Sequence, residues 1–401
     1  ASLNTCEMYR LQGRIQHYSW GGKTFLPGLL NQLNTDGNPF AEYWLGVHPG
    51  GPGLVHLSNG ASTTLLNLIG SDKFKHLGPE TTRAFNELPF LLKILDVKDM
   101  LSIQVHPTKT MAKLGYDAEE QKGISLSAPN RNYKDQNHKP EVMVALSDFW
   151  LLNGFLAPEL LAARLHDCHY FNSLQDYFNG VEYEGLYQYF MQLSSQDADI
   201  ILKPLMMDAV ASVQSDQIDK SHPHWWANKY YNGVVPDSNI DKGIFSIYIL
   251  NIVQVKKYQA VFQGAGLLHA YLEGQNIELM SNSDNVLRGG LTSKHIDIDE
   301  LIKHVQFVPT YPNVLVGDFH NEQETIYPCP VSDFGLTKIT IKQGESYTIQ
   351  SHSIEMLLLM EGQVEMDGIL YNAGEVAMVL ALQHLTIHAK EASVIFKAFV
   401  P

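Results

Sequence analysis

The sequence has few cysteines, no long apolar run and no recognisable targeting segment. Its three cysteines, Cys6, Cys168 and Cys329, have no paired spacing. Such a sparse, odd set suits free thiols in a reducing compartment better than a disulfide framework. No run of about 18 apolar residues occurs, so we expect no membrane span. The N-terminus lacks the basic, apolar and small-residue regions of a signal peptide, and we expect a cytoplasmic protein.

Basic side chains are also scarce. The chain has 28 Lys and Arg against 43 Asp and Glu, which gives a formal net charge of -15. Without a basic field, nucleic acid and anionic membrane surfaces are excluded as partners. An anionic substrate would need a local positive pocket that overcomes this overall charge. Nothing in the sequence indicates an obligate protein partner.

The pattern of apolar residues changes twice along the 401 residues, enough chain for two or three domains. Up to about residue 155, Gly/Pro turns and a helix over 63–68 separate β-rich runs at 90–97, 101–105, 141–146 and 149–155. Pro158 is a favoured first residue of a helix, and helical spacing continues over about 156–240. Strand-like sequence returns from Phe245 to Met280, and a short helix is expected over 299–305.

The last 75 residues have a pattern of their own. Gly-centred turns separate strand-length runs at 335–341, 346–350, 355–360 and 394–399. This pattern predicts a compact β-barrel. His384 and His388 have no carboxylate partner in the pattern, so we interpret this segment as structural. The whole chain is therefore predicted to be mainly β with an α-helical insertion.

One predicted strand carries three polar groups on a single face. In Leu101–Pro107, alternation places Leu101, Ile103 and Val105 on one side and Ser102, Gln104 and His106 on the other. Two further segments repeat this arrangement, because Lys139 and Glu141 share a face, as do His269 and Tyr271. A glutamine, two histidines and a glutamate from three strands make a plausible four-ligand site for a divalent metal.

Each of these residues alone has an ordinary structural explanation. The chain has 17 histidines, and most are expected at the surface or in the core. The pairs His166/His169 and His222/His224 occur in the helical segment without matched carboxylates, and we interpret both as structural. Arg288 follows a turn that begins at Asp284 and precedes two glycines. A salt bridge holding the loop explains Arg288 about as well as a functional role.

Several motifs, in order and at compatible spacings, resemble the type I mannose-6-phosphate isomerase (phosphomannose isomerase) family of the cupin superfamily. The resemblance covers about residues 10–305 and is weakest in the helical segment and the last barrel. The motifs are Tyr18–Gly21, Ala41–Pro49, Gln104-x-His106-Pro107, Asn137–Glu141, Gly264-x-Gly266-x-x-His269-Ala270-Tyr271 and Ser283–Thr292.

The resemblance implies an architecture and a set of site residues. It implies a cupin-type catalytic domain over 1–155 and 240–325, a helical insertion over 156–239, and a cupin-like, jelly-roll β-barrel over 326–401. It also implies one Zn²⁺ per chain, bound by Gln104, His106, Glu141 and His269. The remaining pocket residues comprise a catalytic group and a substrate-binding group: Arg288, Lys139, Glu278 and Tyr271 in the first, and Ser102, Asp284 and Lys294 in the second.

The implied reaction is the interconversion of mannose 6-phosphate and fructose 6-phosphate, and the residue types fit it. A proton must move between neighbouring carbons through an enediolate, whose charge develops on oxygen. A metal can polarise those oxygens as a Lewis acid. Arg288, Lys139 and Lys294 can hold the phosphate or the enediolate, and Glu278 or a lysine can shuttle the proton. Two alternatives stay open: another metal-dependent cupin enzyme, such as an iron oxygenase, and a non-enzymatic sugar-binding cupin.

Overall fold

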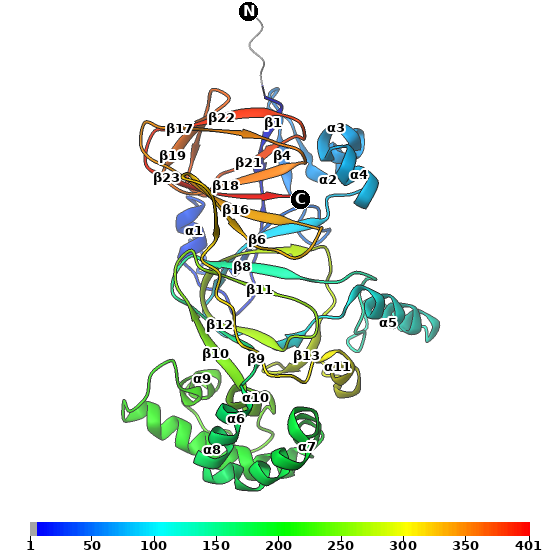
Figure 1. Cartoon of the computed structure of the whole chain (residues 1–401), viewed down its shortest axis with the longest axis vertical. Coiled ribbons are helices and arrows are strands. Elements are labelled where there is room, and N and C mark those ends of the chain that lie inside the picture. The colour runs from blue at the N-terminus through cyan, green and yellow to red at the C-terminus, as the bar shows by residue number, and fades with distance from the viewer. Residues whose placement is uncertain (1–5) are drawn as a thin grey trace, which may run out of the picture.

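The structure is a computed structural model that describes residues 6–401. It is mainly β, with one helical region, and is elongated into three parts (Figure 1). Helices α6 to α9 lie at one end, a central sheet lies in the middle, and the C-terminal strands lie at the other end. Within the described residues, no helix has the length and apolar character needed to cross a membrane.

The central sheet has ten strands and contains all the predicted metal-binding segments. Its longest strand, β12 (His269–Ser281), pairs with β9 and β7 through its first half and with β6 and β8 through its second half. The faces of these strands are therefore neighbours in space. The other strands are β2 (Arg14–Gln16), β3 (Glu42–Leu45), β6 (Phe90–Val97), β7 (Ile103–Val105), β8 (Glu141–Ala145), β9 (Phe149–Phe155), β10 (Leu250–Val255), β11 (Ala260–Gln263) and β13 (Leu287–Gly290).

The C-terminal strands form two sheets that enclose an apolar core, which includes Ile339, Leu357 and Ile387. The four-stranded sheet contains β17 (Ser346–Gln350), β19 (Gln363–Met366), β20 (Ile369–Asn372) and β22 (His384–Ala389). The nine-stranded sheet contains β14 (Asp318–Asn321), β15 (Glu324–Tyr327), β16 (Gly335–Ile341), β18 (Glu355–Glu361), β21 (Val376–Val379) and β23 (Ser393–Phe399), together with β1 (Met8–Gln12), β4 (Leu54–His56) and β5 (Ser62–Thr64).

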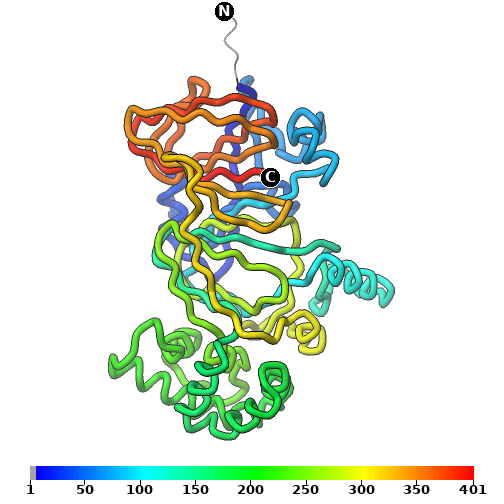
Figure 2. Tube along the Cα trace, in the orientation of Figure 1, coloured from blue at the N-terminus to red at the C-terminus, as the bar shows by residue number. Residues whose placement is uncertain are grey.

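The two ends of the chain meet in this nine-stranded sheet. Strand β1 pairs with β21 on one side and with β4 on the other, so N-terminal strands complete a sheet built mostly from C-terminal ones. Figure 2 shows the chain leaving the central sheet after α11 (Ile298–His304) and passing along it to the C-terminal strands.

The helical region begins where the sequence predicts it. Helix α6 (Pro158–Asp167) has Pro158 in its first turn. It is followed by the short η1 (His169–Phe171), then by α7 (Asn172–Met191), α8 (Ser195–Gln214), α9 (Pro223–Tyr230) and α10 (Gly243–Ile249). The strand expected from Phe245 is wrong in its first part, because that residue lies in α10 and β10 begins only at Leu250. Every residue of α10 is buried, so its sequence lacks the polar face that marks a helix.

Five short helices accompany the N-terminal strands: α1 (Phe25–Leu29), α2 (Leu65–Ser71), α3 (Lys73–Leu77), α4 (Pro79–Phe85) and α5 (Lys109–Gln121). The helix expected over 63–68 begins two residues later, because the Thr64 side chain caps α2 by accepting a hydrogen bond from the Asn67 backbone N–H. The helix expected over 299–305 is α11, which the Asp297 side chain caps in the same way.

Candidate metal centre and active site

Three of the predicted metal ligands meet in the central sheet. His106 directly follows β7, Glu141 begins β8 and His269 begins β12. One ligand atom from each lies within 4.8 Å of the others, and all three side chains are buried. Segments 35 and 128 residues apart in the chain are thus brought to one point. Among the described residues, this is the one group of three or more His, Cys, Asp or Glu side chains with such a geometry.

The hydrogen bonds of the two histidines fix which ring nitrogen faces the centre. His106 Nδ1 donates to the backbone carbonyl of Asn285 at 2.9 Å, and His269 Nδ1 donates to that of Leu267 at 2.7 Å. A carbonyl oxygen can only accept, so each Nδ1 carries a proton. Both Nε2 atoms then face Glu141 Oε1, at 2.9 and 3.1 Å. This second-sphere arrangement is typical of metal-binding histidines.

This convergence of acceptor atoms favours a positive charge between the three residues. In neutral imidazoles with Nδ1 protonated, both Nε2 lone pairs point at a carboxylate oxygen that is itself an acceptor. Burial lowers the pKa of His106 to about 4, although Glu141 partly offsets the effect, so the ring is neutral near pH 7. A divalent cation satisfies all three atoms at once, and N and O donors of this kind suit zinc. The residues present therefore fit the metal.

The fourth predicted ligand, Gln104, lies beside this group in the strand ladder. Its backbone is the register partner of His269 on one side and of Arg288 on the other. It precedes His106 by two positions, which places both side chains on the same face. The structure records no hydrogen bond to the Gln104 side chain from a described residue, and its role as a ligand stays a prediction.

A second set of polar side chains extends from the metal centre along β12. Tyr271 donates a hydrogen bond to Glu278 Oε2 at 2.7 Å, and both are buried. Burial, and then the charge of Glu141, raise the pKa of Glu278 to about 8, although Lys93 and Lys139 counteract this in part. Glu278 therefore changes its protonation state close to neutral pH, as a proton-transfer group needs to.

The sequence analysis missed Lys93, which is buried beside this pair. It lies opposite Glu278 in the β6–β12 register, forms a 3.2 Å ion pair with Glu42 and covers the ring of Trp44 at 4.5 Å. Burial tends to lower the pKa of Lys93, but the Glu42 and Glu278 carboxylates raise it above its ordinary value. One feature of the sequence could have identified Lys93: it is the only basic residue of β6, which is otherwise apolar except for Asp96.

A histidine and an aspartate from distant parts of the chain form a pair. His48 Nε2 donates to Asp284 at 2.8 Å, while its Nδ1 accepts a hydrogen bond from the Gly50 backbone N–H. Burial opposes ionisation of Asp284, but His48 lowers the pKa of Asp284 below its ordinary value. His48 belongs to the Ala41–Pro49 motif, but the sequence analysis assigned it no role. Its partner Asp284 is 236 residues away in the chain.

The predicted cationic residues do not all lie in the same environment. Burial lowers the pKa of Arg288, and no acidic group among residues 6–401 counteracts it, which argues against the structural salt bridge. Burial, Arg131 and then Arg288 lower the pKa of Lys134, so cations adjoin one another here. Lys294 is exposed in the loop after β13, and its side chain makes no recorded contact with described residues of the site. Ser102 is partly buried just before β7.

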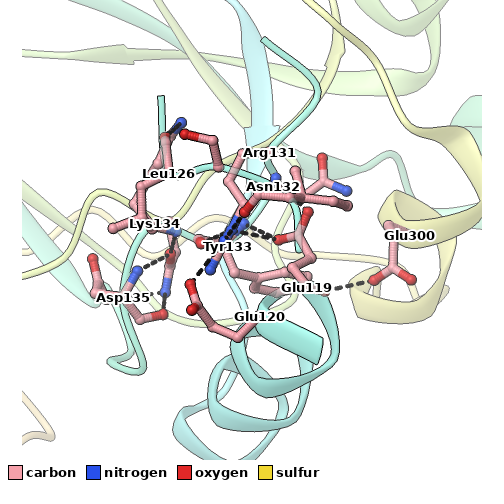
Figure 3. Close-up of polar contacts among 12 residues, drawn as sticks. Glu119, Glu120, Leu126, Arg131, Asn132, Tyr133, Lys134, Asp135 and Glu300 are labelled. Atoms are coloured by element: carbon pink, nitrogen blue, oxygen red, sulfur yellow. Dashed lines mark hydrogen bonds and ion pairs between the residues drawn. The ribbon is translucent and has the colours of Figure 1, made fainter. Parts of the chain in front are cut away.

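Polar contacts connect the loop between α5 and β8 to α5 and to α11 (Figure 3). Arg131 is buried and pairs with Glu119 at 3.3 Å and Glu120 at 3.0 Å. Tyr133 donates to Glu300 of α11 at 2.6 Å, and its backbone N–H donates to Glu119. These contacts fix the loop that carries Lys134 and leads to Lys139.

Asn285 connects this loop to the metal centre. Its side-chain oxygen accepts a hydrogen bond from the Lys134 backbone N–H at 2.7 Å, and its amide donates to the carbonyls of Asp135 and Asn137. Its own carbonyl accepts the bond from His106. Asn285 is fully buried and thereby fixes a metal ligand against the loop.

Comparison with known proteins agrees with this geometry. Residues 8–157 match the model of the phosphomannose isomerase type I catalytic domain. Mannose-6-phosphate isomerase of Salmonella typhimurium is 36% identical over 89% of this chain and 89% of its own length. The chain belongs to the type I phosphomannose isomerase family. The rat mannose-6-phosphate isomerase is 31% identical over 87% of this chain and 86% of its own length.

Solved structures of phosphomannose isomerases have the same fold. A Salmonella typhimurium mannose 6-phosphate isomerase bound to its substrate, fructose 6-phosphate, and to zinc has a TM-score of 0.85 at 30% identity. The match covers 98% of this chain and 99% of the other. A glutamate-to-alanine variant of the enzyme from the same organism has a TM-score of 0.88 with the same coverage. The family membership expected from the motifs is thus confirmed, and the expected zinc is the metal bound in the structure of this relative.

Proposed function

We propose that this phosphomannose isomerase interconverts mannose 6-phosphate and fructose 6-phosphate with one bound zinc ion. The observation that carries the proposal is the convergence of two neutral imidazole nitrogens and a carboxylate oxygen on one buried point. The identity of the substrate comes from the relatives, which are named mannose-6-phosphate isomerases and one of which binds fructose 6-phosphate and zinc in its structure.

Zinc would be held by Gln104, His106, Glu141 and His269. When bound, it supplies a Lewis acid for the carbonyl and hydroxyl oxygens of the substrate. The protein holds the ligands in position through the bonds from each Nδ1 to a backbone carbonyl, so little reorganisation is needed during the reaction.

Glu278 and Tyr271 are the proposed proton-transfer pair. A carboxyl group with a pKa of about 8 is partly ionised at neutral pH, and it can accept a proton from one carbon and return it to the next. The hydrogen bond from Tyr271 favours the ionised form of Glu278 and fixes its orientation. Burial of both groups excludes water that would exchange the proton.

Arg288 and Lys139 are proposed to stabilise negative charge on the substrate, and Ser102, Asp284 and Lys294 to contact it. A guanidinium without an acidic partner is free to bind an oxyanion or phosphate. Lys139 lies two residues before Glu141, the first residue of β8, and its charge acts on Glu141, Glu278 and Asp284. These cations provide the local positive pocket that an acidic protein needs for an anionic substrate.

We also propose two cupin-like barrels, over 1–155 with 240–325 and over 326–401, with the helical insertion over 156–239 interrupting the first of them. The long β12, paired through each half with different strands, supports a closed central barrel. The two facing C-terminal sheets support a second. Strands β1, β4 and β5 would be contributed by the first domain to the second barrel.

The test is removal and return of the metal in a coupled assay for fructose 6-phosphate. Chelated protein should lose activity and regain it with one equivalent of Zn²⁺ per chain. An oxygenase would instead consume dioxygen with iron, and a binding protein would take up the sugar phosphate without turnover. Activity that survives complete metal removal would exclude the proposal.

A further inference from the structure

The turn that follows Arg288 has a backbone conformation that is unfavourable for its sequence. Leu291 has a φ of 56°, in the left-handed region that a leucine seldom occupies, and Gly290 has a φ of 126°. Such conformations persist only where surrounding contacts impose them, and they concentrate at functional sites. The turn begins at Gly290, two residues after Arg288 in the sequence. The contacts that impose its conformation therefore matter for the position of Arg288.

The contacts come from one carboxylate of the helical region. Asp241 lies just before α10, and its Oδ1 accepts hydrogen bonds from the backbone N–H groups of Leu291 at 2.8 Å and Gly243 at 2.7 Å. Its Oδ2 accepts from the Thr292 N–H at 3.0 Å and from the Tyr230 hydroxyl at 3.3 Å. Each carboxylate oxygen thus accepts one hydrogen bond from the turn and one from the helical region, which connects the two.

The backbones at this contact are as close as two glycines allow. A Cβ atom on Gly290 would lie 2.5 Å from Gly243 Cα, and one on Gly243 would lie 2.5 Å from Leu291 N. The start of α10 therefore touches the turn directly. The turn cannot shift toward the helices, and the Asp241 bonds prevent it from moving away.

The ladder of β13 gives Arg288 little independent support at this point. Arg288 is paired with Gln104, but the register shifts between Arg288 and Gly290. Irregularities of this kind redirect a side chain. Among the described residues, no acidic side chain raises the pKa of Arg288, so no ion pair fixes the direction of its guanidinium. The direction of the guanidinium therefore depends on where the turn holds the backbone.

We propose that Asp241 is a positioning residue for Arg288, through which the helical region acts on the isomerase reaction. Asp241 has no hydrogen bond to a metal ligand or to the proposed proton-transfer pair, so its effect on the reaction is expected to pass through the Arg288 turn. The inference rests on the proposed role of Arg288 in the reaction.

The experiment compares Asp241→Asn with wild type in the zinc-loaded enzyme. The amide replaces one acceptor oxygen with a donor that faces backbone N–H or hydroxyl groups, so the turn loses part of its support. Zinc content should be unchanged and kcat/KM should fall about tenfold to a hundredfold, the effect of a misplacement near 1 Å. Asp219→Asn is the matched control, since Asp219 also accepts a backbone N–H, from Ser221, within the helical region and away from the turn. It should keep wild-type kcat/KM.

A double-mutant cycle separates positioning from general destabilisation. In an Arg288→Ala background, Asp241→Asn should cause little further loss of kcat/KM, because the group that it positions is gone. Full kcat/KM in Asp241→Asn, or equal losses with and without Arg288, would overturn the inference. If Arg288→Ala itself retains full kcat/KM, the proposed role of Arg288 fails first, which is a different result. If Asp241→Asn does not fold, Gly243→Ala displaces the same turn and takes its place in the cycle, with the same expected and contradicting results.

Discussion

Tyr271 and Glu278 belong to the same strand, seven positions apart, yet the phenol of one donates to the carboxylate of the other across 2.7 Å. A straight strand would separate them by about 23 Å. They meet because β12 changes pairing partners here: its register with β9 shifts between Tyr271 and Glu273, and its pairing with β6 begins at Gly274, which has a φ of 130°. The bend brings a proton donor onto the carboxylate that we propose as the proton carrier.

This contact predicts a change in the pH profile. Tyr271→Phe removes a hydrogen bond that favours ionised Glu278, so the pKa of Glu278 should rise. Because the ionised form accepts the proton, the acidic limb of kcat/KM should move to higher pH, and activity at pH 7 should fall about tenfold. Zinc content should stay at the wild-type level. An unshifted acidic limb would remove Glu278 from proton transfer.

Arg288 should act on the reaction without affecting the metal. Arg288→Ala should keep the zinc and lower kcat by about a hundredfold or more, the effect of losing one preorganised donor. Arg288→Lys should recover little, because a flexible point charge cannot replace a planar guanidinium. The measurements are kcat, KM and zinc content of both variants. A raised KM with unchanged kcat would assign Arg288 to substrate binding instead.

The histidines outside the central sheet should be dispensable for zinc. None belongs to the buried metal-binding group among the described residues, and His224, for example, bonds to the Tyr248 hydroxyl instead. We expect unchanged zinc per folded chain after replacement of His166, His169, His222, His224, His384 and His388, with stability falling because His224 is buried. Loss of zinc on changing only His222 and His224 would show a role for the helical region in metal binding.

Glu355, the first residue of β18, should make stability depend on pH. Burial raises its pKa to about 7, with Lys397 lowering it and Glu324 raising it, and Glu355 Oε1 has no hydrogen-bond partner among the described residues. A folded-state pKa above the unfolded value means that its contribution to stability is complete below about pH 4.5 and is lost as the pH rises through 7.

The size of this effect can be measured with a neutral replacement. Between pH 4.5 and 8, ionisation of Glu355 should lower the free energy of unfolding of the wild-type protein by up to about 3 kcal/mol. The Glu355→Gln protein should not show this decrease. Chemical denaturation of both proteins across this range tests it. Equal pH dependence in the two proteins would show that the carboxyl of Glu355 ionises normally in the folded state.

Patterns within single segments predicted much of this structure. Turn-bounded β-rich runs gave β6 and β9, and alternating runs between Gly-centred turns gave β16 and β17, all with their observed limits. The same alternation placed His106, Glu141 and His269 for metal binding. Helix α10 was missed because burial on every side leaves no periodic signal.

Contacts between distant segments could not be predicted in this way. The partners of Asn285 lie about 150 residues earlier, and its role depends on two loops meeting. Lys93 is charged within a buried strand, and only the fold shows that Glu42 and Glu278 compensate for it. The role proposed for Asp241 likewise requires the helical region to lie against the β13 turn.

The zinc content of His106→Ala, measured together with its isomerase activity, tests the central claim most directly. His106 supplies one of the three converging ligand atoms. Its loss leaves His269 and Glu141, with Gln104 as the further predicted ligand. Wild-type protein should contain about one zinc per chain, and the folded variant should lose both zinc and the formation of fructose 6-phosphate. A folded His106→Ala protein with full zinc occupancy and wild-type turnover would contradict the account.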